Sequence, residues 1–250
     1  MQMTLTALPG IPLIRPGDDL AGLIFISVKQ AGIELETGDL LAVAQKIVSK
    51  AEDRTVDLSQ SQPSKPARNL AEEAQKDPRL VEVILSESRE VLRVRPGLII
   101  VEHRLGFVCA NAGVDHSNVE GDQTVLLLPE DPERSANEIR ESLERASGAS
   151  LGVLIIDSHG RAWRMGTEGV AIGVSQIPAL LDLRGKPDLF GRRLEVTQVG
   201  LADELAAAAS IVMGQADEKR PVVHVRGFPH PLREGSIREI MRPKELDLFR

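Results

Sequence analysis

Hydrophobic and polar positions follow two different periodicities in alternating segments of the chain. Apolar residues spaced three and four apart are typical of amphipathic helices, and unbroken apolar runs bounded by polar turns are typical of buried strands. The helical pattern covers residues 18–32, 63–75, 77–88, 131–148 and 201–214. Strand patterns cover 97–104, 124–129, 151–161 and 221–227, and 38–52 begins as a strand before it turns polar. The alternation predicts an α/β or mixed α+β fold.

Residues with known preferences for helix ends support these boundaries. An aspartate pair precedes the first helix, Pro78 stands in the first turn of the third, and Gly148 follows the fourth. Beyond residue 228 the chain is charged and interrupted by proline. We therefore expect one domain over 1–228 and a peripheral C-terminal extension over 229–250.

Composition excludes several classes of protein. The net charge of −7 and an aromatic content of 2% argue against nucleic-acid binding, which favours basic faces and stacking platforms. The single cysteine, Cys109, excludes an intrachain disulfide and paired-cysteine zinc sites. We see no signal peptide and no apolar run of membrane-spanning length, so we expect a cytoplasmic protein with no membrane partner.

Familiar nucleotide and hydrolase motifs are missing. The chain has no GxxxxGK[ST] phosphate loop, no GxGxxG after a strand, no GxSxG and no HExxH. The glycine-rich stretch 166–174 has the wrong spacing for either phosphate motif. Any phosphate ligand must therefore be bound in another way, through a few cations or a metal ion.

Two carboxylates could supply such a metal site. In "LGVLIIDSHGR", the strand delivers Asp157 and Ser158 to its C-terminal end, where ligands of α/β sheets gather. In "VCANAGVDHSN", Gly113 allows a tight bend before Asp115, and Asn118 could orient a ligand. Oxygen donors without imidazole or thiolate suit Mg²⁺ or Mn²⁺. The pattern alone leaves open that both aspartates merely cap polar turns.

Several other residues have a structural and a functional interpretation. Lys50 ends a strand-like run and could be a point charge for phosphate, or a solvated lysine. Cys109 is expected to be a small buried side chain, and Trp163 to pack in the core. Four arginines could bind phosphate or form surface ion pairs: Arg161, Arg164, Arg192 and Arg193.

Longer motifs resemble one enzyme family. The combination of "NAGVDHSN", "DSHGRAWRMG" and "DLFGRRLEVT" is similar to the coenzyme F-420:L-glutamate ligase family. Further matching segments such as "AQKIVSKAE", "ADELAAAASIVMGQAD" and "VVHVRG" follow in the family's order. The resemblance covers residues 8–228 and makes 1–228 the ligase domain. It implies an unusual two-lobed α/β fold that forms a homodimer, with the active site near the subunit interface.

The resemblance also implies a reaction. GTP phosphorylates the terminal carboxylate of the glutamate-free coenzyme F-420-0, and the amine of L-glutamate displaces phosphate from the acyl phosphate. Further γ-linked glutamates can follow. Two divalent ions, Mg²⁺ or Mn²⁺, take part, and a monovalent cation such as K⁺ is a further expectation. Because the chain ends at Arg250, we expect it to lack the flavin-dependent reductase domain of some bacterial relatives.

Site residues are carried over motif by motif. Asp115 and Asp157 resemble ligands of one metal ion, and Ser158 and Gln215 resemble ligands of the second, although the family often has a carboxylate at the latter position. The resemblance implies catalytic roles for Asp115, Asp157 and Lys50. The nucleotide-contacting positions that it implies are Gly10, Ile11, Pro12, Leu13, Gln45, Lys46, Lys50 and Asn118.

Three hypotheses follow for the function. The first is a GTP-dependent amide ligase with GTP, L-glutamate and coenzyme F-420-0 as partners. The second is a nucleotide- or metal-binding regulatory module that has lost ligation. The third is a ligase of the same fold that acts on a different carboxylate. The intact set of Asp115, Asp157, Ser158 and Lys50 favours the active enzyme.

Overall fold

A five-stranded sheet forms the centre of the larger lobe. The computed structural model describes residues 1–248. The sheet has the order β1-β12-β2-β8-β9, and only β2 and β8 run parallel to each other. Its strands are β1 (Thr4–Ala7), β12 (Val222–Arg226), β2 (Leu40–Ala44), β8 (Gly152–Gly160) and β9 (Thr167–Ser175). The central strand β2 is almost fully buried, which explains its continuous apolar run.

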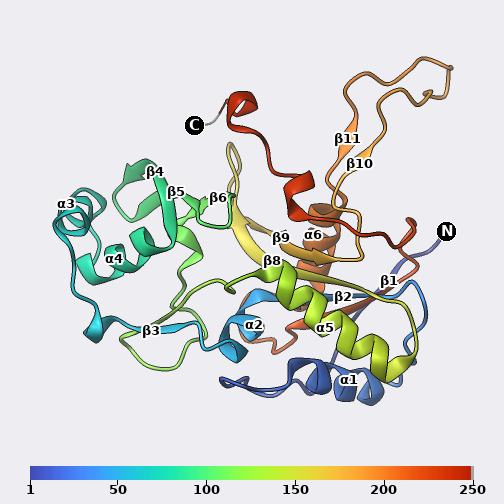
Figure 1. Cartoon of the computed structure of the whole chain (residues 1–250), viewed down its shortest axis with the longest axis horizontal. Coiled ribbons are helices and arrows are strands. Elements are labelled where there is room, and N and C mark those ends of the chain that lie inside the picture. Colours follow the sequence, from blue (N-terminus) through green and yellow to red (C-terminus); the bar gives the residue numbers. More distant parts are fainter. Residues whose placement is uncertain (249–250) are drawn as a thin grey trace.

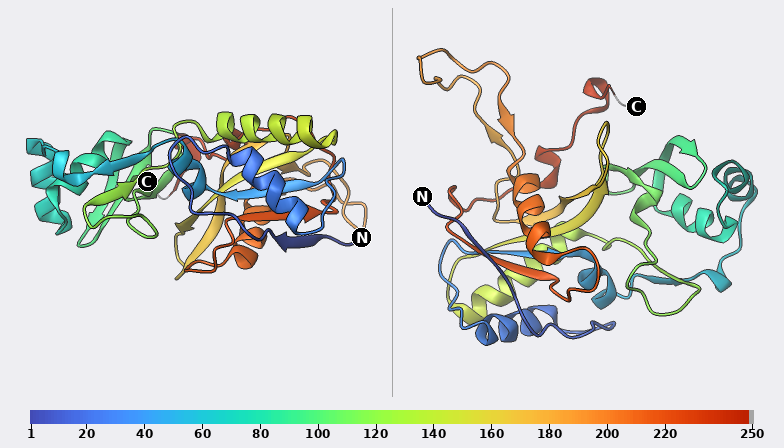
Figure 2. Two further views of the ribbon diagram at one scale, coloured as in Figure 1. Left: turned by 90° about the horizontal axis from the view of Figure 1, so that it is seen from below. Right: turned by 180° about the vertical axis from the view of Figure 1, so that it is seen from behind.

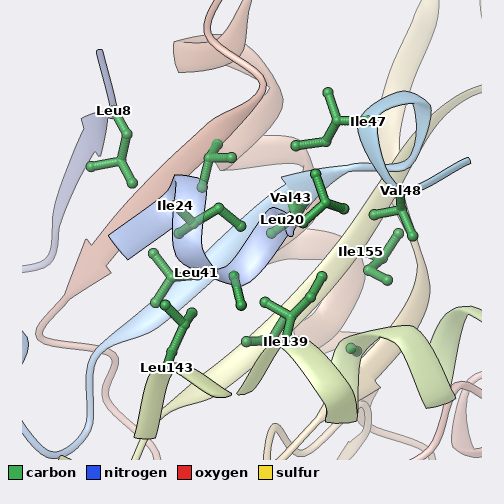
Figure 3. Close-up of a cluster of buried hydrophobic side chains, with 14 of the residues drawn as sticks. Leu8, Leu20, Ile24, Leu41, Val43, Ile47, Val48, Ile139, Leu143 and Ile155 are labelled. Carbon is green, nitrogen blue, oxygen red and sulfur yellow. The ribbon is translucent and has the colours of Figure 1, made fainter. Parts of the chain in front are cut away.

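Helices cover both faces of this sheet (Figure 1). On one face lie α1 (Leu20–Gln30), α2 (Gln45–Ala51) and α5 (Pro132–Ser147); on the other lies α6 (Leu201–Met213). Successive side chains of a strand point to opposite faces, so Leu41 and Val43 join the first core and Leu40 and Ala42 the second. Figure 3 shows the first of these cores.

The second lobe has its own small core. It contains α3 (Lys65–Ala74), α4 (Pro78–Ser86) and a three-stranded sheet of β4 (Ser88–Arg95), β5 (Leu98–His103) and β6 (Val108–Ala110). Buried alanines of α3 and apolar residues of α4 pack on β5. A two-stranded pair, β3 (Thr55–Asp57) with β7 (Thr124–Leu126), connects this lobe to the larger one (Figures 1 and 2). The arrangement agrees with the two lobes that the resemblance implied.

Two further segments extend from the larger lobe. A long hairpin that starts from β10 (Leu181–Asp182) and β11 (Gln198–Val199) projects away from the sheet (Figure 1). The C-terminal segment packs on the second core through Ile237, which is 4% exposed and whose N–H donates to Glu133. Short 3-10 turns complete the described chain at Leu58–Gln60, Asn111–Gly113, Ile237–Glu239 and Lys244–Leu246.

The predicted helices are all present, with small changes at their ends. Asp19 caps α1 by accepting the N–H of Gly22, and Gly148 follows α5 in the left-handed conformation. No helix in the described residues is long and apolar enough to cross a membrane. The domain boundary at 228 stays a prediction.

Two structural expectations were wrong, and one alternative that the sequence left open is excluded. Lys50 lies on helix α2 and not at the end of a strand, because the polar half of 38–52 starts a new helix at Gln45. Strand β8 extends to Gly160, close to the predicted end, and Asp157 pairs with Val170 within it, which excludes the alternative that Asp157 only caps a turn. Trp163 is 88% exposed, since the β8–β9 hairpin carries its turn beyond the sheet.

Candidate active site

Strand β8 presents Asp157 and Ser158 to its two sides. Asp157 lies on the side of the second lobe, where its Oδ2 is 3.0 Å from Nε2 of His159. Ser158 points the other way, and its hydroxyl donates to Oε1 of Gln215 at 2.8 Å. Adjacent residues of a strand diverge in this way by geometry alone. Any ligand bound by both side chains must therefore span the end of β8.

The loop that carries Asp115 begins with an unusual turn. Asn111, Ala112 and Gly113 have successive φ values of +50°, +53° and +66°, all in the left-handed region. The Asn111 side chain stabilises the turn by accepting the N–H of Ile99 at 3.1 Å. A Cβ on Gly113 would lie 2.8 Å from the Leu128 side chain, so only glycine fits there without rearrangement. The bend predicted at Gly113 is confirmed.

Asp115 is held as an ion. Its carboxylate is 2.7 Å from Nζ of Lys46, and it accepts the backbone N–H of Ser117 at 2.7 Å and the Ser117 hydroxyl at 3.0 Å. Burial alone would raise the pKa of Asp115, but the hydrogen bonds from Lys46 and Ser117 outweigh it and leave the pKa below the ordinary value. A carboxylate ionised in this way is competent to bind a cation.

Two lysines of α2 face the same loop. Lys46 contacts Asp115, and Lys50, one helical turn further, donates to the carbonyl oxygen of Asn118 at 2.6 Å. Burial and then the charge of Lys46 lower the pKa of Lys50. Like charges four residues apart on a helix repel each other. An anionic ligand with several charges would relieve this repulsion.

A chain of contacts joins six of the predicted residues: Lys46, Lys50, Asp115, Asn118, Gln215 and Ser158. The side-chain amide of Asn118 donates to the carbonyl oxygen of Ala216 at 3.2 Å. Ala216 follows Gln215, which contacts Ser158 on β8. The structure thus brings together α2, the loop 115–118, the turn 214–218 and the end of β8, four segments that are far apart in the sequence.

The oxygen donors suit a hard divalent ion. Nε2 of Gln215 donates to the Ser210 hydroxyl at 2.8 Å, which turns Oε1 toward Ser158. Oγ of Ser158 and Oε1 of Gln215 are 2.8 Å apart. Neighbouring ligands of octahedral Mg²⁺ lie about 2.9 Å apart for bond lengths of 2.0–2.1 Å. The separation is equally that of the hydrogen bond between them, so coordination of one ion by this pair stays a prediction.

Asp115 and Asp157 do not belong to a cluster of metal-binding side chains in the described residues. Within residues 1–248, no group of three or more His, Cys, Asp or Glu residues is placed to hold a metal ion. Asp115 contacts Lys46 and Asp157 contacts His159. Shared coordination of one ion by both aspartates stays a prediction.

The N-terminal loop runs beside α1 and α2. The Ser27 hydroxyl of α1 donates to the carbonyl of Pro9, and the N–H of Gly17 donates to the carbonyl of Ala51 in α2 at 2.9 Å. Between these anchors, Leu13 is 84% exposed. The nucleotide contacts predicted for this loop, at Gly10, Ile11, Pro12 and Leu13, stay predictions.

Gln45 differs from the lysines that follow it. It is 2% exposed, and its Oε1 accepts the hydroxyl of Ser49 at 2.9 Å within α2. The side chain therefore braces the helix that carries Lys46 and Lys50. A direct contact between Gln45 and the nucleotide stays a prediction.

Other candidates have structural roles. Burial, helped by the charge of Asp157, raises the pKa of the Cys109 thiol to about 12, so the thiol is inert and packs in the second lobe as expected. Arg161 forms an ion pair with Glu168 at 3.2 Å, and Arg193 donates to the carbonyl of Gly185 at 2.8 Å. The Arg161 contact is the surface ion pair that the sequence left open as an alternative, whereas Arg193 contacts the backbone.

Sequence reasoning missed two residues of this region. Ser117 holds Asp115, and His159 contacts Asp157. His159 stands two residues after Asp157, so the alternation of β8 could have placed both on one face of the strand. The predicted strand included His159, but the search for ligands considered only Asp157 and Ser158.

Comparison with known proteins identifies the family of the chain. The family model described as F420-0:Gamma-glutamyl ligase matches residues 10–227. The chain is 48% identical to the coenzyme F420:L-glutamate ligase of Methanothermobacter thermautotrophicus, with 100% of both chains covered. It is 51% identical to the enzyme of that name from Methanopyrus kandleri, over 95% of this chain and 93% of the relative.

A more distant relative gives the same result. The coenzyme F420:L-glutamate ligase of Archaeoglobus fulgidus is 41% identical, over 100% of this chain and 97% of the relative. The family model covers most of the chain, including α2, the loop 115–118, β8 and Gln215. The chain therefore belongs to the F420-0:gamma-glutamyl ligase family.

Proposed function

We propose that this protein is a GTP-dependent coenzyme F420-0:L-glutamate ligase of F420 biosynthesis. Family membership over residues 10–227 supports the reaction class. The observation that carries the proposal for this chain is the contact chain from Lys46 and Lys50 through Asp115 and Asn118 to Gln215 and Ser158. It combines paired cations for phosphate with oxygen donors for a hard ion.

The chemistry explains why such a site is needed. A carboxylate is a poor electrophile until it carries a good leaving group. The carboxylate oxygen of F420-0 attacks the γ-phosphorus of GTP, the bond to GDP breaks, and an acyl phosphate forms. The neutral amine of L-glutamate then attacks the acyl carbon, loses a proton, and displaces phosphate. Phosphoryl transfer of this kind depends on positioning and charge neutralisation rather than on a protein nucleophile.

The side chains have distinct roles in this scheme. Lys46 and Lys50 leave their contacts with the loop 115–118 and bind the phosphate oxygens as point charges. Asp115 and Asp157 would hold one divalent ion, and Ser158 with Gln215 a second, of Mg²⁺ or Mn²⁺. Such ions neutralise charge on the phosphate oxygens when bound. Asn118 links the loop 115–118 to the turn 214–218 and so fixes the position of these two segments relative to each other.

A homodimer is part of the proposal. The projecting β10–β11 hairpin exposes Leu189 at 99%, Phe190 at 86% and Val196 at 84%. Large apolar side chains gathered on one projection are typical of an association surface. Light scattering of the purified protein tests this, because a monomer at micromolar concentration would contradict it.

One assay separates the ligase from its alternatives. Purified protein is incubated with GTP, Mn²⁺, L-glutamate and F420-0, and the product mass is followed. A ligase yields coenzyme heavier by one or more glutamyl units, together with GDP and phosphate. GTP binding without any mass gain would indicate a regulatory module. A gain only with another carboxylic acid would indicate a different substrate.

A further inference from the structure

His159 is the polar side chain closest to Asp157. Its Nε2 lies 3.0 Å from Oδ2 of Asp157, and the two side chains are only 15% and 13% exposed. Both stand on β8, two residues apart, and so on the same face of the strand. Within residues 1–248 the other carboxylate oxygen, Oδ1, accepts no hydrogen bond. Oδ1 is therefore the oxygen left to contact a ligand.

The imidazole is itself packed between the β5–β6 turn and helix α6. Its ring packs against the Phe107 ring with centroids 5.6 Å apart, and Phe107 stacks on the fully buried His103 at 5.3 Å. On another side lies Asp203 of α6, whose carboxylate accepts the N–H of Ala171 in β9 at 3.0 Å. His159 and Asp203 line one cavity of about 240 Å³.

A ring fixed in this way can fix the carboxylate that it contacts. A hydrogen bond from Nε2 to Oδ2 removes the free rotation of the Asp157 carboxylate. Partners of this kind commonly orient metal-binding carboxylates, and their loss typically costs about 10–100-fold in metal affinity. We propose that His159 is a positioning residue: it binds Oδ2 of Asp157 and so directs Oδ1 toward the divalent ion. The inference rests on the proposed function of Asp157 as a metal ligand.

Direct binding of the imidazole to the ion is the competing interpretation. A nitrogen and an oxygen 3.0 Å apart could both coordinate one metal ion. The separation is also that of an ordinary hydrogen bond, and the oxygen donors elsewhere in the site suit an ion that prefers oxygen. Electron paramagnetic resonance of bound Mn²⁺ separates the two, because a coordinated imidazole nitrogen adds a hyperfine coupling that a hydrogen-bonded one lacks.

Two variants test the proposal without relying on turnover. His159→Leu removes the donor, whereas His159→Gln places an amide nitrogen near the position of Nε2. Mn²⁺ is titrated into the full-length protein in the absence of GTP, and the signal of free Mn²⁺ gives the dissociation constant. Asp157→Asn identifies the site that is being measured, and thermal melting confirms that each variant is folded.

We expect His159→Leu to weaken Mn²⁺ binding about 10–100-fold and His159→Gln to restore most of the loss. Bound Mn²⁺ in the wild-type protein should show no nitrogen coupling from His159, as checked with ¹⁵N-labelled histidine. Unchanged affinity in the Leu variant, equal losses in both variants, or a histidine coupling would each overturn the positioning role. If Asp157→Asn binds Mn²⁺ as the wild type does, or if the wild type binds none, the assignment of Asp157 as a metal ligand in the proposed function is wrong.

Discussion

The ammonium group of Lys46 lies 2.7 Å from the carboxylate of Asp115, where the proposed function requires a divalent ion. The lysine therefore neutralises the carboxylate in this structure and competes with a metal for it. GTP phosphates would draw Lys46 away and release Asp115. Nucleotide and metal should consequently strengthen each other's binding.

Lys46→Met tests this competition. A partly exposed ion pair is worth about 0.2–1 kcal/mol, so the variant should bind Mn²⁺ about 1.4- to 5-fold more tightly in the absence of nucleotide. Its KM for GTP should rise, because a phosphate cation is lost. Lys65→Met changes an exposed lysine on α3 and is the matched control. Weaker Mn²⁺ binding by Lys46→Met without nucleotide would contradict the competition.

A carboxylate in place of Gln215 should increase the affinity of the proposed second site for its metal ion. Its Oε1 lies 2.8 Å from the Ser158 hydroxyl, and the amide carries no charge. Gln215→Glu adds a carboxylate at the proposed second metal and should lower the Mn²⁺ concentration for half-maximal activity, by about tenfold, because ligand charge tunes the affinity of such sites. Gln215→Ala should raise that concentration. An identical metal dependence in wild type and both variants would remove Gln215 from the metal site.

The ionisation of Glu87 should make the free energy of unfolding depend on pH. Its carboxylate receives Arg54 and Arg104, each at 2.9 Å, and lies 3.6 Å from His103, so it ties the two lobes together. Burial alone would raise the pKa of Glu87, but His103, Arg104 and Arg54 outweigh it and lower the pKa from 4.5 to about 2. The stabilisation is therefore present above pH 4.5 and is lost as the pH falls toward 2.

Glu87→Gln should accordingly destabilise the protein at pH 7 by about 1.5–3 kcal/mol, because Arg54 and Arg104 then keep only their ion pairs with Glu130. Urea unfolding at a series of pH values measures the difference from wild type, which should shrink as the pH falls below 4.5. Glu73→Gln, on the exposed face of α3, provides the control. A difference independent of pH would show that the Glu87 charge is not what joins the lobes.

Cys109 should resist thiol reagents. It is 6% exposed, and burial together with the charge of Asp157 raises its pKa to about 12. At pH 8 the native protein should react with iodoacetamide far more slowly than the urea-unfolded protein. Mass spectrometry of both samples measures the modification. Rapid labelling of the native thiol would contradict its placement in the core of the second lobe.

Periodicity was sufficient for α1, α3, α4, α5, α6 and the central strands, because each has a long apolar face and clear end signals, but it missed the short helix α2. It failed where tertiary structure decides the outcome. Strand β9 contains Gly169 and Gly173, because a Cβ at either position would lie 2.5 Å from a backbone carbonyl oxygen of a helix that packs on the sheet. These glycines interrupt the apolar pattern, so the sequence did not predict a strand there. Trp163 has a large apolar side chain of the kind usually found in a core, but it stands in an exposed hairpin turn.

The candidate site was predictable only in part for the same reason. Motifs indicated Asp115, Asp157, Ser158 and the α2 lysines, but spacing could not show that four separate segments meet. The contacts of Lys46 with Asp115 and of Ser158 with Gln215 arise from the packing of α2, β8 and the turn after α6. The residue pattern of one segment does not show which other segments it contacts in the folded protein.

The product mass formed from F420-0, GTP, L-glutamate and Mn²⁺ tests the central claim most directly, with wild type and Asp157→Asn compared in parallel. The wild-type protein should add at least one glutamyl unit and release GDP and phosphate, whereas the folded Asp157→Asn variant should add none. A wild-type protein that leaves the coenzyme mass unchanged, or a variant with near-normal turnover, would contradict the account.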